Sequence, residues 1–370
     1  MSNAVNKFKP DWLHLVPPGL SMKEDMEHVG FSQVEFAQRM GYTAKHIHKL
    51  IKGEASITAD TALKLEKVLS YPSSFWLNAE SHYREALAKE KEKIALEKEQ
   101  NWLKQIPLKS MIDWGWVDKF QNKGDQVRAC LKFYGVASIQ SFEKQTQSYQ
   151  VAFKSCDKFD RDPIAIQTWL RKGEIEATKI ICNAFNKKNF QSVLGDLRAL
   201  TLVENLEDFL PKLIDLCAKC GVAVVFAPTP AKCPMSGATK WLATDKALLL
   251  LSLRHKTNDH LWFAFFHEIA HILKHKKQLF LEEKKEFSND KILEDEADKF
   301  ASDLLIPAEK NEQLKNLTSE ESIKSFAKEM GIHSGIVVGR LQHKKIIPWG
   351  CFNSLKVKYD IKQNIEKELA

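Results

Sequence analysis

The chain has 370 residues, which is long enough for two or three domains with sizeable cores. Its formal net charge of +7 is compatible with binding to nucleic acid but does not require it. We exclude membrane spans and expect a cytoplasmic protein, because no apolar run reaches about 18 residues and the N-terminus lacks the apolar core of a signal peptide. The seven scattered cysteines indicate reduced thiols rather than a disulfide framework.

Four short helices are predicted near the N-terminus. Residues 21–24 and 32–35 each begin with Ser and end with Glu, the pattern of a capping box, so each is expected to begin a helix. Gly41 ends the second helix, and residues 59–69 form the fourth. The buried side of the second helix is expected to consist of Val34, Phe36, Ala37 and Met40.

The third helix, over residues 44–52, is expected to be capped by Thr43 and to have a basic outer face. Its inward side is predicted to be formed by Ile47, Leu50 and Ile51. On the opposite side, at positions i, i+3, i+4 and i+7, lie Lys45, His48, Lys49 and Lys52, with His46 beside them. A helix, a tight turn that contains Gly and a second helix with a basic face form the helix-turn-helix pattern.

The stretch of residues 18–77 is similar to the XRE-type regulators, in particular the antitoxin branch typified by HigA. The resemblance implies an all-helical domain that binds double-stranded operator DNA as a homodimer, with its third helix in the major groove. The residues expected to contact DNA are Gln33, Thr43, Lys45, His46 and Lys49. Among them, Gln33 would reach phosphate through its side chain or through the N-terminus of its helix. The alternative interpretation of the basic face is an ordinary solvated surface.

The middle of the chain carries no chemical motif. Residues 85–105 are dense in Glu and Lys at helical spacing, which predicts an exposed linker helix. Amphipathic stretches such as 164–170 and 177–185 predict a helical scaffold or dimerisation region, with a ligand-sensing region as the alternative. Cys217-Ala-Lys-Cys220 has no second cysteine pair, so we expect these thiols to pack rather than to bind a metal.

Residues 261–275 contain the most informative motif, His267-Glu-Ile-Ala-His271. The run has no Gly or Pro and is apolar enough to be a buried helix. Both imidazoles then lie on one face and can bind one zinc ion, with Glu268 beside them to take a proton from water. His275 also lies four residues from His271, but that pair lacks an intervening Glu. At the helix end, His275 is expected only to complement the helix dipole.

Zinc hydrolases usually supply three protein ligands and leave one position open, so a third ligand is needed. A second helix, stopped by Pro307, is predicted by an apolar stripe that consists of Leu293, Ala297, Phe300, Ala301, Leu304 and Leu305. Glu294 lies roughly 60° from the middle of this stripe and Glu296 roughly 100° away on the other flank. Glu294 is therefore closer to the side of the helix that faces the core, and we expect Glu294 to be the ligand and Glu296 to be solvated. Asp298, one turn after Glu294, is expected to accept the second ring N–H of a liganding histidine.

The two helices together resemble the ImmA/IrrE metallopeptidases of bacteria and their phages. The resemblance runs from about residue 221 to about residue 349 and includes residues 233–239, 247–253 and 332–341. It implies a zinc site at His267, His271 and Glu294, with Glu268 as the general base. Many relatives carry Asn where Asp298 stands. The resemblance also implies a substrate class, because family members characteristically cleave a repressor of the helix-turn-helix type.

Cys233 precedes a Pro and a Ser-Gly pair in a loop between predicted strands. Two roles are open to it. Its thiol either packs in the core or approaches the open zinc position as a removable ligand.

We therefore predict an α+β chain that is mostly α. An all-helical helix-turn-helix domain is followed by a charged linker helix, a helical middle, a zincin-like domain with a small sheet packed on the His-Glu-x-x-His helix, and a charged tail that is expected to be helical after Leu355. The expected ranges are, in order, 1–80, 81–107, 108–209, 210–350 and 351–370.

The leading hypothesis is a transcriptional regulator whose zinc endopeptidase domain cleaves a repressor, either itself or a partner, to relieve repression. One alternative is a HigA-like antitoxin or repressor, with a possible toxin partner, whose zinc module senses or stabilises without turnover. A housekeeping metalloprotease is a third interpretation, which the N-terminal domain disfavours. Membranes are not expected partners.

Overall fold

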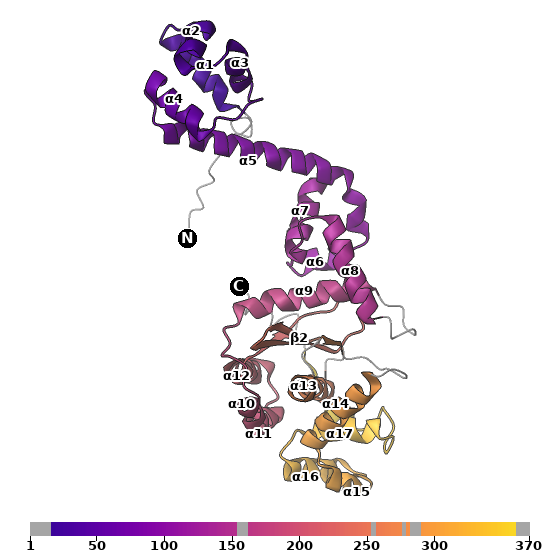
Figure 1. Cartoon of the computed structure of the whole chain (residues 1–370). Coiled ribbons are helices and arrows are strands. Elements are labelled where there is room, and N and C mark those ends of the chain that lie inside the picture. The colour runs from indigo at the N-terminus through magenta and orange to yellow at the C-terminus, as the bar shows by residue number, and fades with distance from the viewer. Residues whose placement is uncertain (1–15, 154–161, 253–256, 276–278, 282–289, 360–370) are drawn as a thin grey trace, which may run out of the picture. The chain divides into compact units, whose positions relative to one another are not determined.

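The computed structural model describes residues 16–153, 162–252, 257–275, 279–281 and 290–359 (Figure 1). It is mostly helical with one small sheet, which confirms the predicted fold class. The chain divides into two compact units, Met1–Asn101 with Phe120–Arg128, and Trp102–Lys119 with Ala129–Ala370. Within the described residues, no helix combines the length and the apolar character that a membrane span requires.

The first unit contains the predicted N-terminal helices and the long helix that follows them (Figure 1). Their bounds are α1 (Pro18–His28), α2 (Gln33–Met40), α3 (Ala44–Ile51), α4 (Ala59–Leu69) and α5 (Ser73–Lys98). Its core consists of large apolar side chains from all five helices, among them Met22, Phe36, Ile47, Leu65 and Trp76. The long helix α5 begins directly after Pro72 and ends earlier than the linker helix predicted to reach residue 105.

Two caps and one turn are as predicted. Ser32 caps α2 and Thr43 caps α3, each accepting a hydrogen bond from a backbone N–H. Gly41 ends α2 with a φ of 68°, a left-handed conformation that glycine adopts at little cost.

Two local predictions about the N-terminal helices are wrong. Ser21 lies inside α1, because Pro18 already begins that helix. Val34 is 60% exposed, so the buried side of α2 consists of Phe36, Ala37 and Met40.

The second unit contains the remaining helices and the sheet; helix α7 spans the boundary between the two units. The helices are α6 (Leu108–Asp113), α7 (Lys123–Tyr134), α8 (Ile139–Phe153), α9 (Pro163–Lys179), α10 (Lys187–Ser192), α11 (Leu194–Ala199), α12 (Leu206–Lys219), α13 (Asn258–Lys274), α14 (Asp290–Leu305), α15 (Asn311–Leu314), α16 (Glu320–Met330) and α17 (Ser334–His343). The strands are β1 (Val222–Phe226), β2 (Gly237–Ala243), β3 (Lys246–Leu251) and β4 (Phe280–Leu281).

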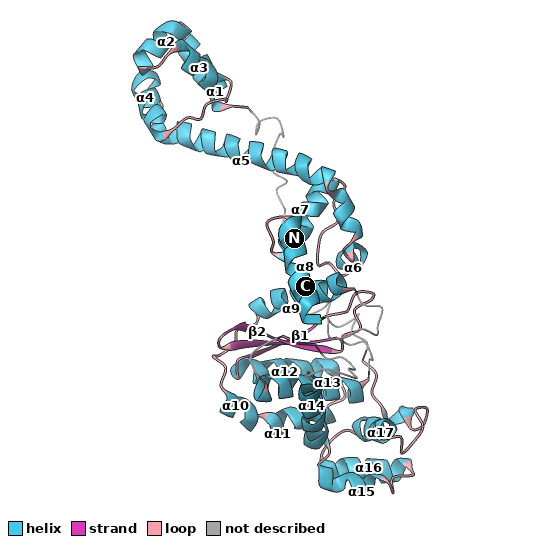
Figure 2. Cartoon of the chain, turned by 45° about the vertical axis from the view of Figure 1, so that its right-hand side comes forward, coloured by secondary structure: helices cyan, strands magenta, loops and turns pink. Residues whose placement is uncertain are grey.

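The sheet has the strand order β1-β3-β2-β4 and is covered on both faces (Figure 2). Strand β3 pairs in parallel with β1 and antiparallel with β2. Because side chains alternate along a strand, Val222 and Val224 pack toward α12 and α13, whereas Ala223 and Val225 pack toward α9. The His-Glu-x-x-His helix therefore lies directly on the sheet, as predicted.

Helix α9 covers the other face of the sheet, although the sequence placed it in a separate region of residues 108–209. The helix predicted over 177–185 does not form, because α9 ends at Lys179. The Lys246 ammonium donates to the carbonyls of Ala177 and Ile180, at 2.7 Å each. It thus supplies hydrogen-bond donors to backbone carbonyls at the end of α9. The division of the chain into five segments remains a prediction.

The beginning of the predicted tail is part of the packed unit. Leu355 and Tyr359 are buried, and Lys358 forms a β-bridge with Thr257 just before α13. Residues 356–359 are therefore extended rather than helical, because they pair with the chain that leads into α13. The remainder, residues 360–370, lies outside the described residues.

Candidate metal centre and DNA-binding helix

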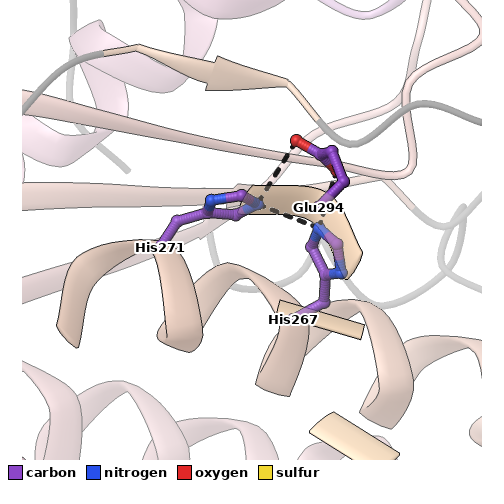
Figure 3. Close-up of side chains that lie close together, drawn as sticks. All are labelled: His267, His271 and Glu294. Carbon is purple, nitrogen blue, oxygen red and sulfur yellow. Dashed lines mark hydrogen bonds and ion pairs between the residues drawn. The ribbon is translucent and has the colours of Figure 1, made fainter. Parts of the chain in front are cut away.

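Helices α13 and α14 bring three predicted ligands together (Figure 3). The Nε2 atoms of His267 and His271 lie 3.0 Å apart, as expected for side chains one helical turn apart. The carboxylate of Glu294 reaches across from α14, with Oε2 3.2 Å from Nε2 of His267 and Oε1 3.7 Å from Nε2 of His271. One ligand atom from each residue thus lies within 4.8 Å of the other two.

The chemistry of this cluster fits a zinc ion. The side chains of His267, His271 and Glu294 are 2%, 0% and 11% exposed, so little water competes for their donor atoms. Two imidazole nitrogens and one carboxylate oxygen form a ligand set typical of zinc hydrolases, which keep a further position for water or substrate. These three residues could therefore hold a divalent metal.

Each histidine is also held through its other ring nitrogen. The Nδ1 atom of His267 lies 2.8 Å from Oδ1 of Asp298, the partner expected from the sequence. The Nδ1 atom of His271 lies 2.8 Å from Nδ1 of His275, at the end of α13. Contacts of this kind fix the orientation of an imidazole that binds a metal.

Sequence reasoning gave no role near the site to His275 and Glu296, yet they form an outer layer of it. Nε2 of His275 lies 3.4 Å from Oε2 of Glu296, and this contact lowers the pKa of the Glu296 carboxyl. The spacing could have predicted that His275 lies beside His271, because His275 follows His271 by the same four residues that separate the two predicted ligands.

Glu268, the predicted base, is completely buried against strand β2. The hydroxyl of Thr239 donates a hydrogen bond to Oε2 of Glu268. A Cβ atom at Gly237 would lie 2.5 Å from Oε1 of Glu268, so only glycine allows this close approach. The family resemblance includes Thr239 but assigns it no role, because its contact with Glu268 depends on how β2 lies over α13.

Cys233 does not join the donor atoms of His267, His271 and Glu294 in the described part of the chain. It is 4% exposed and packs in the core between the sheet and α9, with Met235 and Ala238. Its position supports the packing role.

Helix α3 has the two faces predicted from its sequence. Ile47, Leu50 and Ile51 are buried. The outer face is basic and exposed, and it is formed by Lys45, His48, Lys49 and Lys52. His46 is half-buried, because its ring packs on Tyr42 with 4.6 Å between the ring centroids. The lysines therefore present positive charge to solvent along one face of a short helix.

Gln33 and Thr43 are engaged within the fold. The side-chain amide of Gln33 donates to the carbonyl of Ala44 at 3.0 Å, which ties the start of α2 to the start of α3. The hydroxyl of Thr43 accepts the N–H of His46 at 3.2 Å. These contacts position the two helices, and contacts of either residue with DNA remain predictions.

Two family models match the chain. Residues 22–76 match the helix-turn-helix family, and residues 218–341 match the IrrE N-terminal-like domain. The first match covers α2 and α3, and the second covers the sheet, α13 and α14. No curated protein matches the chain.

Several solved structures are similar to part of the chain. An addiction module antidote protein of the HigA family from Coxiella burnetii is 30% identical over 23% of this chain and 95% of its own, with a TM-score of 0.22. A putative antidote protein of a plasmid maintenance system from Nostoc punctiforme is 26% identical over 22% and 91%, with a TM-score of 0.22. A Pseudomonas aeruginosa protein in complex with its operator DNA is 24% identical over 20% and 80%, with a TM-score of 0.19.

Proposed function

We propose that this chain, an XRE-type helix-turn-helix protein that also carries an IrrE-like domain, is a DNA-binding regulator that cleaves a repressor, either itself or a partner. The observation that carries the proposal is the convergence of His267, His271 and Glu294 beside Glu268, on a chain with a helix-turn-helix domain. Domains of this type normally bind paired half-sites as homodimers, so a homodimer is part of the proposal.

The chemistry follows from the residues around the cluster. A zinc ion held by the three ligands would supply Lewis-acid activation of a water molecule and of the peptide carbonyl. Glu268 accepts a proton from the attacking water at its carboxylate and returns it to the nitrogen of the departing amine. Thr239 fixes the orientation of that carboxylate through Oε2. Asp298 holds the ring of His267 so that Nε2 is directed at the cluster.

The basic face of α3 supports the DNA-binding part of the proposal. Lys45 and Lys49 are exposed on the helix that enters the major groove in this class of domain. Their flexible ammonium groups suit phosphate oxygens, which carry most of the affinity for DNA.

The test uses the full-length protein. It is incubated with zinc alone, with its own promoter fragment and with candidate partner repressors, and fragments are identified by mass spectrometry. We expect defined fragments that are absent with Glu268→Gln, while that variant still binds stoichiometric zinc. Cleavage that survives in Glu268→Gln would refute the assigned chemistry.

The burial of Glu268 favours a second candidate function. With its carboxylate held by Thr239 and closed off from solvent, the IrrE-like domain can serve as a sensing or structural zinc module of an antitoxin-like repressor. In that case no cleavage product forms under any condition, and operator binding by Glu268→Gln equals that of the unaltered protein.

A further inference from the structure

Helices α13, α14 and α17 enclose a pocket that the proposed function does not use. Most of its wall is apolar, with Phe263 from α13, Leu305 from α14 and Ile336 from α17. Trp349, which is 60% exposed, stands at its rim. Concave sites with an apolar wall and a few polar groups are typical of small-molecule binding sites.

The wall of the pocket carries an incompletely paired cation. Arg340 donates through Nη1 to the hydroxyl of Ser302. Its Nε–H is buried and has no acceptor among the residues that the structure describes. A guanidinium offers five N–H donors and keeps its charge, so a buried N–H without an acceptor favours an anionic partner.

Two carboxylates and two histidines also lie near the pocket. Asp259 lines the pocket; its Oδ2 accepts a hydrogen bond of 2.6 Å from the ammonium of Lys356, whereas its buried Oδ1 has no partner among the described residues. Asp303 lies near Arg340 and opposes the lowering of its pKa by burial. His260 and His343 also line the pocket, and the ring of His343 can add a donor.

The pocket is distinct from the metal-binding cluster but shares its two helices. Phe263 lies one turn before His267, with 6.3 Å between their ring centroids. Ser302 lies one turn after Asp298. No residue of the pocket wall is among the three proposed metal ligands.

We propose that this pocket binds a small free carboxylate with an apolar body, such as a short-chain carboxylic acid. The carboxylate pairs with the guanidinium of Arg340, and the carbon chain packs on Phe263, Leu305 and Trp349. This ligand matches the pocket, because its carboxylate can pair with the one arginine of the wall and its carbon chain can pack on the rest of the wall, which is mostly apolar.

The test measures the binding of hexanoate to the full-length protein by calorimetry. EDTA is present, so that the carboxylate cannot bind a zinc ion. We expect saturable binding of hexanoate and none of hexanol. Arg340→Gln is expected to weaken binding about tenfold or more, since a charge-assisted hydrogen bond is lost. Trp349→Ala should weaken it severalfold and, because Trp349 is exposed, should leave the fold intact.

Lys344→Ala is the matched control. It removes an exposed cation next to the pocket but not in its wall, and binding should not change. The proposal is overturned if hexanoate does not bind, if hexanol binds equally, or if Trp349→Ala and a folded Arg340→Gln both bind as the unaltered protein does. Binding of a peptide with a free C-terminal leucine but not of hexanoate would assign the pocket to a chain terminus and would equally overturn it.

Discussion

The imidazole of His267 is held from outside the cluster by the carboxylate of Asp298, with 2.8 Å between Nδ1 and Oδ1. Asp298 itself is half exposed, whereas His267 is buried. A side chain of α14 therefore fixes the orientation of an imidazole on α13. In this orientation, Nε2 of His267 faces Glu294.

Removal of this contact should weaken metal binding. We expect Asp298→Ala to lower zinc affinity by about 10- to 100-fold, the usual effect of removing a partner that orients a liganding histidine. Asp298→Asn retains an acceptor oxygen and should lose less. Competition with a colorimetric chelator measures both. Asp295→Ala, an exposed position on the same helix, is the control, and an unchanged affinity in Asp298→Ala would show that the ring of His267 is held by other contacts.

The contact between Thr239 and Glu268 gives a prediction for stability. Thr239→Val keeps the shape of the side chain but removes the donor to a completely buried carboxylate. We expect the free energy of unfolding to fall by about 1–3 kcal/mol, the cost of a buried acceptor without a partner. Urea denaturation followed by circular dichroism measures this difference.

Two further variants separate this effect from a simple packing defect. Thr239→Ser retains the hydroxyl and should lose less stability than Thr239→Val. In the double variant with Glu268→Gln, the loss should be smaller than the sum of the two single losses, because both remove the same contact. Strictly additive losses would mean that the two side chains do not interact.

The helices of the site could be predicted from periodicity, and their contacts could not. A spacing of four residues predicts that His267 and His271 share one face, and the apolar stripe of α14 turns Glu294 toward α13. Thr239 and Gly237 belong to a strand whose place over α13 depends on the order of four strands and on long-range packing. Val34 was misassigned because α2 is only eight residues long, and so short a pattern defines its buried side poorly.

The basic face of α3 should control the salt dependence of DNA binding. If Lys45 and Lys49 contact phosphates, replacing either with Ala weakens binding to all sequences about equally and reduces the slope of log K against log salt concentration by about one. Fluorescence anisotropy with the protein's own promoter fragment at several salt concentrations measures the slope. Lys67→Ala on α4 is the control, because it removes an exposed lysine outside α3. Equal slopes in all variants would exclude α3 as the phosphate-binding face.

Arg198 joins three chain segments, and its loss should destabilise the second unit. Its guanidinium donates to the carbonyls of Leu304, Leu305 and Met330 at 2.7, 2.9 and 2.6 Å, near the ends of α14 and α16. We expect Arg198→Met to lower the free energy of unfolding by about 2–3 kcal/mol, and Arg198→Lys to recover only part of it, because an ammonium cannot reproduce the planar donor geometry. Urea denaturation tests both, and a Lys variant equal to the unaltered protein would contradict the role of that geometry.

Acid should loosen the start of α5 through Glu66. Its Oε2 accepts the backbone N–H of Ser73 at 2.5 Å, and this contact lowers the pKa of the Glu66 carboxyl below its ordinary value of 4.5. Because the pKa is lower in the folded state, the stabilisation is fully present above the ordinary value and is lost as the pH falls through the folded pKa. NMR titration of the carboxyl carbon of Glu66 and of the Ser73 amide should give one shared midpoint below 4.5, and Glu66→Gln should abolish the response of the amide. A carboxyl midpoint at the ordinary value, or an amide that does not follow it, would show that the two groups do not interact in solution.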